Sequence, residues 1–213
     1  MVATRIVTVP WEVDERLTSF GVSRHELFEI VRAVVAARAN AVDDDPASAE
    51  GLLAYIYGTR ALRQVFRQRG WLKHREDNVE SVKHADRDLK IVYQSVDLAA
   101  DASYRPQAVS GKGSGADRLI AAGQKGLFSE AELETLRRRG LSELKVGAWF
   151  FCVSVDGDDV RAELSLPSGI VGGNFDAFIE RIFIVNSGEW AGSVIREVAV
   201  PDAIEFEPTV SRK

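Results

Sequence analysis

The chain of 213 residues is long enough for one domain or two small ones, and it can bury a core without disulfides or metals. With 46% apolar and 28% charged residues, it has the composition of a folded soluble protein, which excludes a collagen, a coiled coil, a disulfide scaffold and a disordered chain. The net charge of −5 argues against a protein that coats nucleic acid, although a local basic patch is still compatible with nucleic-acid binding.

The chain contains one cysteine, Cys152, which cannot form an internal disulfide. Its first residues lack the apolar core of a secretion signal, and its longest apolar run, residues 146–153, is far too short to span a membrane. We therefore expect a cytoplasmic protein that does not enter membranes. Because Cys152 lies inside that apolar run, we expect a small buried side chain rather than a nucleophile.

The N-terminal region begins with a possible short strand, Arg5 to Val9. Further on, Ser23 and Glu26 have the spacing of a capping box, in which each side chain binds the backbone amide of the other residue. Apolar residues follow at helical spacing. This pattern predicts a helix at about 23–39.

Helix signals continue after this segment. Asp45 and Pro46 have the residue types of an N-cap and a first helical position. The spacing of the apolar residues then shifts at Gly58, which predicts a kink or a break. We therefore expect two helices, at about 46–58 and 59–69.

The middle of the chain combines a strand, a loop and two short helices. Alternation predicts a strand at 89–96. Residues 97–115 show no period, and a loop of that length is usually functional or mobile. A glycine-rich stretch and a second capping box then predict helices at about 115–124 and 130–139.

The last third of the chain has mostly strand signals. Residues 147–155 and 160–166 predict two strands joined by a tight turn at Gly157, since an Asp-Gly pair favours hairpin turns. Further strands are expected at 194–200 and 203–206.

One segment of this region is ambiguous. Five apolar residues from Phe175 to Phe183 have helical spacing, which suggests a helix starting at Asn174. The β-branched and aromatic residues at 182–185 would fit a strand equally well.

These elements predict an α+β fold. We expect a mixed, mostly helical subdomain over residues 1–140, with one or two strands, and an antiparallel β subdomain over residues 141–213. The second part is acidic, with 12 acidic and 6 basic side chains. No linker separates the two parts, so they are expected to pack together, possibly as one domain.

The most concrete candidate site is a basic stripe. Residues 60–75 contain six basic side chains and no acidic one. Helical spacing places Arg60, Arg63 and Arg67 on one face of the predicted helix, and further basic and aromatic side chains follow them in the sequence. The candidate site residues are Arg60, Arg63, Arg67, Trp71, Lys73 and Arg75. This stripe could bind the phosphates of a nucleic acid or an acidic protein surface, or it could be a solvated helix face with its aromatic residues in the core.

A second candidate is a glycine-rich loop before a predicted helix. Its residues are Gly111, Lys112, Gly113 and Ser114. Backbone amides at a helix N-terminus can hold an anion, although the spacing is not that of a phosphate-binding Walker loop. The loop could therefore contact an anion or a protein partner, or simply be flexible.

No local catalytic or metal-binding motif is present, and no cofactor is expected. One cysteine and three scattered histidines do not form a zinc pattern. We therefore expect a non-enzymatic binding protein, an accessory or inhibitory factor that docks on a larger protein complex. The first alternative is a nucleic-acid-binding protein that uses Arg60, Arg63 and Arg67. The second is a metal-dependent nuclease or another enzyme whose site is assembled from distant residues.

Overall fold

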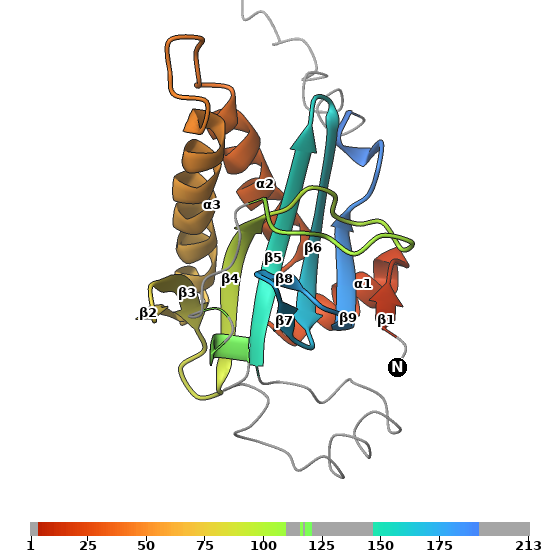
Figure 1. Ribbon diagram of the computed structural model, residues 1–213. Coiled ribbons are helices and arrows are strands. Elements are labelled where there is room, and N and C mark those ends of the chain that lie inside the picture. Colours follow the sequence, from red (N-terminus) through yellow and green to blue (C-terminus); the bar gives the residue numbers. More distant parts are fainter. Residues whose placement is uncertain (1–3, 110–115, 117, 121–146, 192–213) are drawn as a thin grey trace, which may run out of the picture.

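A computed structural model describes residues 4–109, 116, 118–120 and 147–191 (Figure 1). In this part of the chain, three helices cover one face of a seven-stranded sheet. The helices are α1 (Pro10–Thr18), α2 (Arg24–Arg38) and α3 (Ala49–Gln68). The strands of the sheet are β1 (Arg5–Val7), β2 (Leu72–Glu76), β3 (Val79–Lys83), β4 (Leu89–Ser95), β5 (Gly147–Asp156), β6 (Asp159–Pro167) and β9 (Phe178–Val185). A small hairpin is formed by β7 (Ile170–Val171) and β8 (Asn174–Phe175).

The main sheet is mixed, with the strand order β1-β9-β6-β5-β4-β3-β2. The β1–β9 and β4–β5 pairs are parallel, and the other neighbouring strands are antiparallel. The α+β prediction is therefore confirmed in outline, but two details differ. The described residues of the N-terminal part contribute four strands instead of one or two, and the sheet as a whole is not antiparallel. The expected boundary near residue 140 lies outside the described residues, and the strands on either side of it share this sheet.

Helix α2 forms as predicted. The backbone amide of Glu26 donates to Ser23 Oγ at 3.2 Å, and the Ser23 amide donates to a Glu26 carboxylate oxygen at 2.8 Å. Strand β1 also lies within the predicted segment. Helix α1 was not predicted. Pro10 stands in its first turn, where proline is favoured because the N–H groups of that turn make no hydrogen bond within the helix.

Helix α3 corrects two predictions. The Asp45 carboxylate accepts a hydrogen bond from the Val42 amide at 3.0 Å in a separate turn, so the helix begins at Ala49 and not at Pro46. The helix is also continuous through Gly58. A Cβ atom on Gly58 would lie 2.5 Å from ring carbons of Tyr93 in β4. Gly58 therefore allows close packing of α3 on the sheet instead of breaking the helix.

The β2–β3 hairpin was not predicted. Asp77 and Asn78 both have positive φ, at 49° and 64°, and form its two-residue turn. Such a turn is typical of hairpins. The sequence shows no clear strand pattern here, because β2 is rich in charged side chains and most of its residues are exposed.

In the C-terminal part, β5 and β6 form as predicted, with Gly157 at positive φ in the turn between them. The helix expected from Asn174 is wrong. Asn174 lies in β8, and β9 is a strand with alternating faces. The structure thus agrees with the alternative reading of residues 182–185. The segments expected as strands at 194–200 and 203–206 lie outside the described residues.

Two consecutive charges on β9 form ion pairs. Glu180 is fully buried and contacts Arg16 of α1 at 2.9 Å. The next residue, Arg181, contacts Glu163 of β6 at 2.6 Å. Because neighbouring side chains of a strand point to opposite faces, the first pair ties the sheet to the helices and the second lies on the other face.

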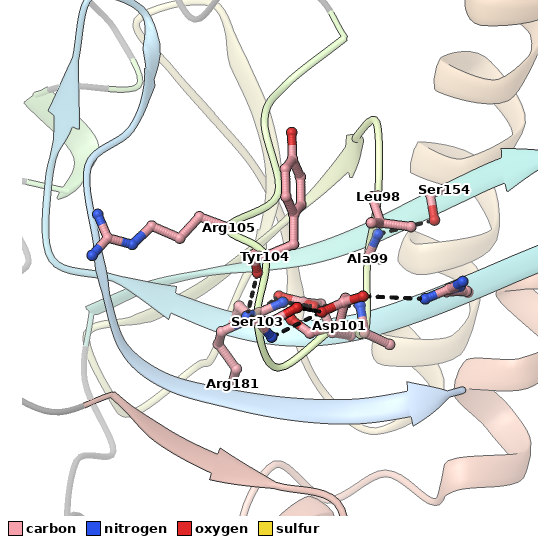
Figure 2. Close-up of polar contacts among 12 residues, drawn as sticks. Leu98, Ala99, Asp101, Ser103, Tyr104, Arg105, Ser154 and Arg181 are labelled. Atoms are coloured by element: carbon pink, nitrogen blue, oxygen red, sulfur yellow. Dashed lines mark hydrogen bonds and ion pairs between the residues drawn. The ribbon is translucent and has the colours of Figure 1, made fainter. Parts of the chain in front are cut away.

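That other face is covered by the segment after β4 and by the β7–β8 hairpin (Figure 1). Arg181 donates to the backbone oxygens of Asp101 at 2.9 Å and Tyr104 at 2.8 Å (Figure 2). The Ala100 amide donates to Glu163 at 2.6 Å, and the Ala99 amide donates to Ser154 at 3.0 Å. The described part of the predicted loop, residues 97–109, is therefore irregular in conformation but held at several points.

The remaining expectations for this region concern Ala116 and its neighbours. Residues 116 and 118–120 are helical, in agreement with the helix predicted at 115–124 as far as it is described. The helix expected at 130–139 lies outside the described residues.

Cys152 is fully buried, as expected, in the apolar cluster under the 97–109 segment. Among the described helices, none is both long and apolar enough to cross a membrane.

The buried phenol of Tyr93 gives the fold a measurable pH dependence. Burial raises the pKa of Tyr93 to about 12, whereas a tyrosine in the unfolded chain ionises near pH 10. Between pH 10 and 12 the unfolded chain releases the Tyr93 proton, whereas the folded protein retains it. The free energy of unfolding is therefore unaffected by this group below pH 10 and falls as the pH rises through this interval. We expect the Tyr93→Phe variant to lose less stability between pH 9 and 11.5 than the wild type. Urea unfolding at both pH values measures this difference, and equal losses would contradict the prediction.

Candidate functional site: a cationic groove beside α3

A groove of about 790 Å³ lies between α3 and the β2–β3 hairpin. We call it the cationic groove. Its lining residues are Tyr55, Ile56, Thr59, Arg60, Arg63, Gln64, Arg67, Gln68, Lys73 and Glu80. A smaller hollow of about 460 Å³ beside α1 has two arginines and two glutamates and no excess of either charge.

The helix itself explains why the arginines gather in this groove. Leu62 and Phe66 are fully buried against the sheet and α2, which fixes the rotation of α3. Arg60, Arg63 and Arg67 are spaced by three and four residues, so they follow one another on the outward face. These three arginines of the predicted stripe therefore line one groove, and Lys73 joins them from β2. Their role as a binding site stays a prediction.

One of these arginines is held in place by the hairpin. Arg63 forms an ion pair with Glu80 of β3 and donates to the backbone oxygen of His74 at 3.3 Å. Glu80 also contacts Arg75 at 3.4 Å, and Arg75 donates to Asn78 at 2.9 Å. Arg63 therefore connects α3 to the hairpin, and its charge is largely balanced inside the protein.

The other three cations have no carboxylate partner within the described residues. Arg60, Arg67 and Lys73 are all exposed. The guanidinium of Arg60 lies 4.5 Å from the ring centre of Tyr57, a cation–π contact that orders the side chain and leaves its charge uncompensated. The groove thus presents a net positive charge to an incoming molecule.

Apolar side chains stand beside these charges. Tyr55 and Ile56 line the groove and are 44% and 47% exposed. Leu52, one helical turn earlier, is 56% exposed. Burial and the nearby Glu80 carboxylate raise the pKa of Tyr55, so its phenol remains protonated at neutral pH and can donate a hydrogen bond. An exposed apolar patch next to unpaired arginines is characteristic of a protein interface.

Trp71 and Arg75, also predicted from the sequence, do not line this groove. Trp71 is buried and packs edge-on against Phe66, with ring centres 4.9 Å apart. Arg75 is exposed and contacts Asn78 of the hairpin turn and the groove residue Glu80. The loop residues Gly111, Lys112, Gly113 and Ser114 lie outside the described residues.

Several groove residues were not among the sequence candidates. Ile56, Gln64 and Gln68 share the helical spacing of the arginines, so the stripe could have been extended to them once the outward face was known. Glu80 could not be found in this way, because its pairing with Arg63 depends on the unpredicted hairpin.

In the described part of the chain, no three His, Cys, Asp or Glu side chains form a group able to hold a metal ion. A scan against protein-family models, a search of curated proteins and a search of solved structures each gave no match.

Proposed function

We propose that this protein is a non-enzymatic binding protein of the cytoplasm, an accessory or inhibitory factor that docks on a larger protein complex through the cationic groove. The observation that carries the proposal is the set of three exposed cations without carboxylate partners, Arg60, Arg67 and Lys73, beside exposed Tyr55 and Ile56. The occupant we infer is a protein segment that carries carboxylates next to apolar side chains.

Charge complementarity supports an acidic occupant. Carboxylates placed against the unpaired cations would gain attraction and would speed association. Tyrosine and arginine are also the residue types that contribute most to binding energy at protein interfaces. The groove supplies both types within two turns of α3.

The apolar lining favours a protein over a nucleic acid. Bases stack on flat aromatic or guanidinium surfaces, whereas Leu52 and Ile56 offer aliphatic surface, which suits apolar side chains. Nucleic-acid binding is therefore an outcome that the experiment below must be able to reveal.

The test is a selection from a random linear peptide library displayed on phage, with the intact protein as bait. The groove variant carries Arg60→Glu and Arg67→Glu. The control carries Lys83→Glu and Arg118→Glu, which make the same change in net charge at two cations outside the groove. In the described part of the chain, Lys83 pairs with the surface acid Asp88 at 3.8 Å and Arg118 with the surface acid Asp77 at 2.6 Å. Loss of such pairs costs little stability.

We expect enriched peptides that contain acidic and apolar residues, with a Kd weakened ~100-fold by the groove variant and less than ~3-fold by the control. Equal binding to all three proteins, or no enrichment, would contradict the proposal. Fluorescence anisotropy with single-stranded DNA and RNA of mixed sequence covers the alternative. Binding that is lost in the groove variant and weakens steeply with salt would indicate a nucleic-acid site instead.

A further inference from the structure

Strand β2 is the last strand of the sheet order, and within the described residues only β3 pairs with it. Among the residues that the structure describes, its other edge therefore has no strand partner for its backbone groups. Such an edge can pair with an extended segment of another protein, and natural proteins usually protect it.

The hairpin register shows which backbone groups are free. The Asp77–Asn78 turn makes Glu76 and Val79 the closing pair, which exchanges both hydrogen bonds. Hydrogen-bonded and non-bonded pairs alternate along an antiparallel ladder. Lys73 and Arg75 are therefore in non-bonded pairs, and their N–H and C=O groups point away from β3.

The side chains of these two residues lie on the same face of the sheet as the groove. Lys73 stands opposite Val82, which belongs to the core beneath the helices, and Lys73 itself lines the groove. A strand added at this edge would therefore run along the outward face of α3. Its alternate side chains would point toward Arg60, Arg67 and Lys73.

We propose that the free edge of β2 accepts an extended acidic segment of the protein partner as an added strand. This inference rests on the proposed function and specifies how the partner is recognised. Main-chain hydrogen bonds to Lys73 and Arg75 supply affinity without regard to sequence, and carboxylates at every second residue supply specificity through the groove. The cations on β2 repel a second copy of the same edge, so this edge favours an acidic strand.

The first experiment uses the peptide most enriched on the wild-type protein in the selection above. Two analogues are synthesised, each N-methylated at alternate backbone amides in opposite phase. In an added strand, only one phase of amides faces β2. We expect N-methylation of that phase to weaken binding ~30-fold or more and N-methylation of the other phase to change it less than ~3-fold. Similar affinities for both analogues would overturn strand addition and leave groove docking intact.

The second experiment measures amide hydrogen exchange by NMR on the whole protein with and without that peptide. Saturation is expected to slow exchange at Lys73 and Arg75 by at least ~10-fold, because their amides gain acceptors. His74 is the internal control, since its amide already faces β3. Unchanged exchange at Lys73 and Arg75 with the peptide bound would overturn the inference. Failure of the selection to enrich any peptide would refute the proposed function itself.

Discussion

Replacing Arg181 by alanine is expected to destabilise the protein by ~3–5 kcal/mol, since removal of one partner leaves a buried charge without compensation. Arg181 is 3% exposed and its partner Glu163 is fully buried. The guanidinium also donates to two backbone oxygens of the 97–109 segment, at Asp101 and Tyr104. The variant therefore loses both the ion pair and the attachment of this segment to the sheet.

Urea unfolding measures the loss, with Arg105→Ala as the matched control. Arg105 is exposed, and its guanidinium donates to the Asp176 backbone oxygen at 3.0 Å, so truncation of this side chain is expected to cost less than ~1 kcal/mol. The double variant Arg181→Met with Glu163→Leu is expected to be more stable than Arg181→Ala, because it leaves no unpaired charge. A cost below 1 kcal/mol for Arg181→Ala would contradict the assignment.

The second large effect is expected at Gly58. Alanine normally stabilises a helix interior by ~1 kcal/mol relative to glycine. At Gly58, however, the new Cβ would lie 2.5 Å from the Tyr93 ring, which is buried and cannot move freely. We therefore expect Gly58→Ala to destabilise the protein by ~1–3 kcal/mol through overpacking.

The same helix provides the control for this prediction. A Cβ on Gly51 would have no atom within 4 Å, so Gly51→Ala is expected to stabilise the protein by up to ~1 kcal/mol. Opposite signs at the two positions in thermal or urea unfolding would support the packing argument. A stabilising Gly58→Ala would show that α3 does not lie as close to β4 as described.

The sequence predicted the elements whose signals are local. The capping box at Ser23 and the Gly157 turn depend on residues a few positions apart, and both form as expected. The apolar spacing around Gly58 misled the prediction because two faces of α3 are buried, one on α2 and one on the sheet. Helical spacing at Phe178 and Ile182 was misleading for a related reason: β9 is buried on both faces, so its apolar residues do not alternate with polar ones.

The candidate site was predictable in part. The arginine stripe follows from helical spacing once a helix is recognised, and the structure brings Arg60, Arg63 and Arg67 together as expected. Which of these arginines is paired was not predictable. Arg63 pairs with Glu80 of the β2–β3 hairpin, and the polar residues of that hairpin do not show a clear strand pattern in the sequence. Likewise, the burial of Trp71 depends on its contact with Phe66.

Site-specific photo-crosslinking in cells of the source organism tests whether the cationic groove docks an acidic protein segment. A photoreactive phenylalanine derivative replaces Gln64 in the groove or, as a control, Val171, which is 68% exposed on β7. We expect a discrete protein adduct at position 64 that survives nuclease treatment, is attached through an acidic segment and disappears with Arg60→Glu and Arg67→Glu. An adduct of equal yield at position 171, one that persists in the groove variant, or one that nuclease removes would show that the groove does not dock an acidic protein segment.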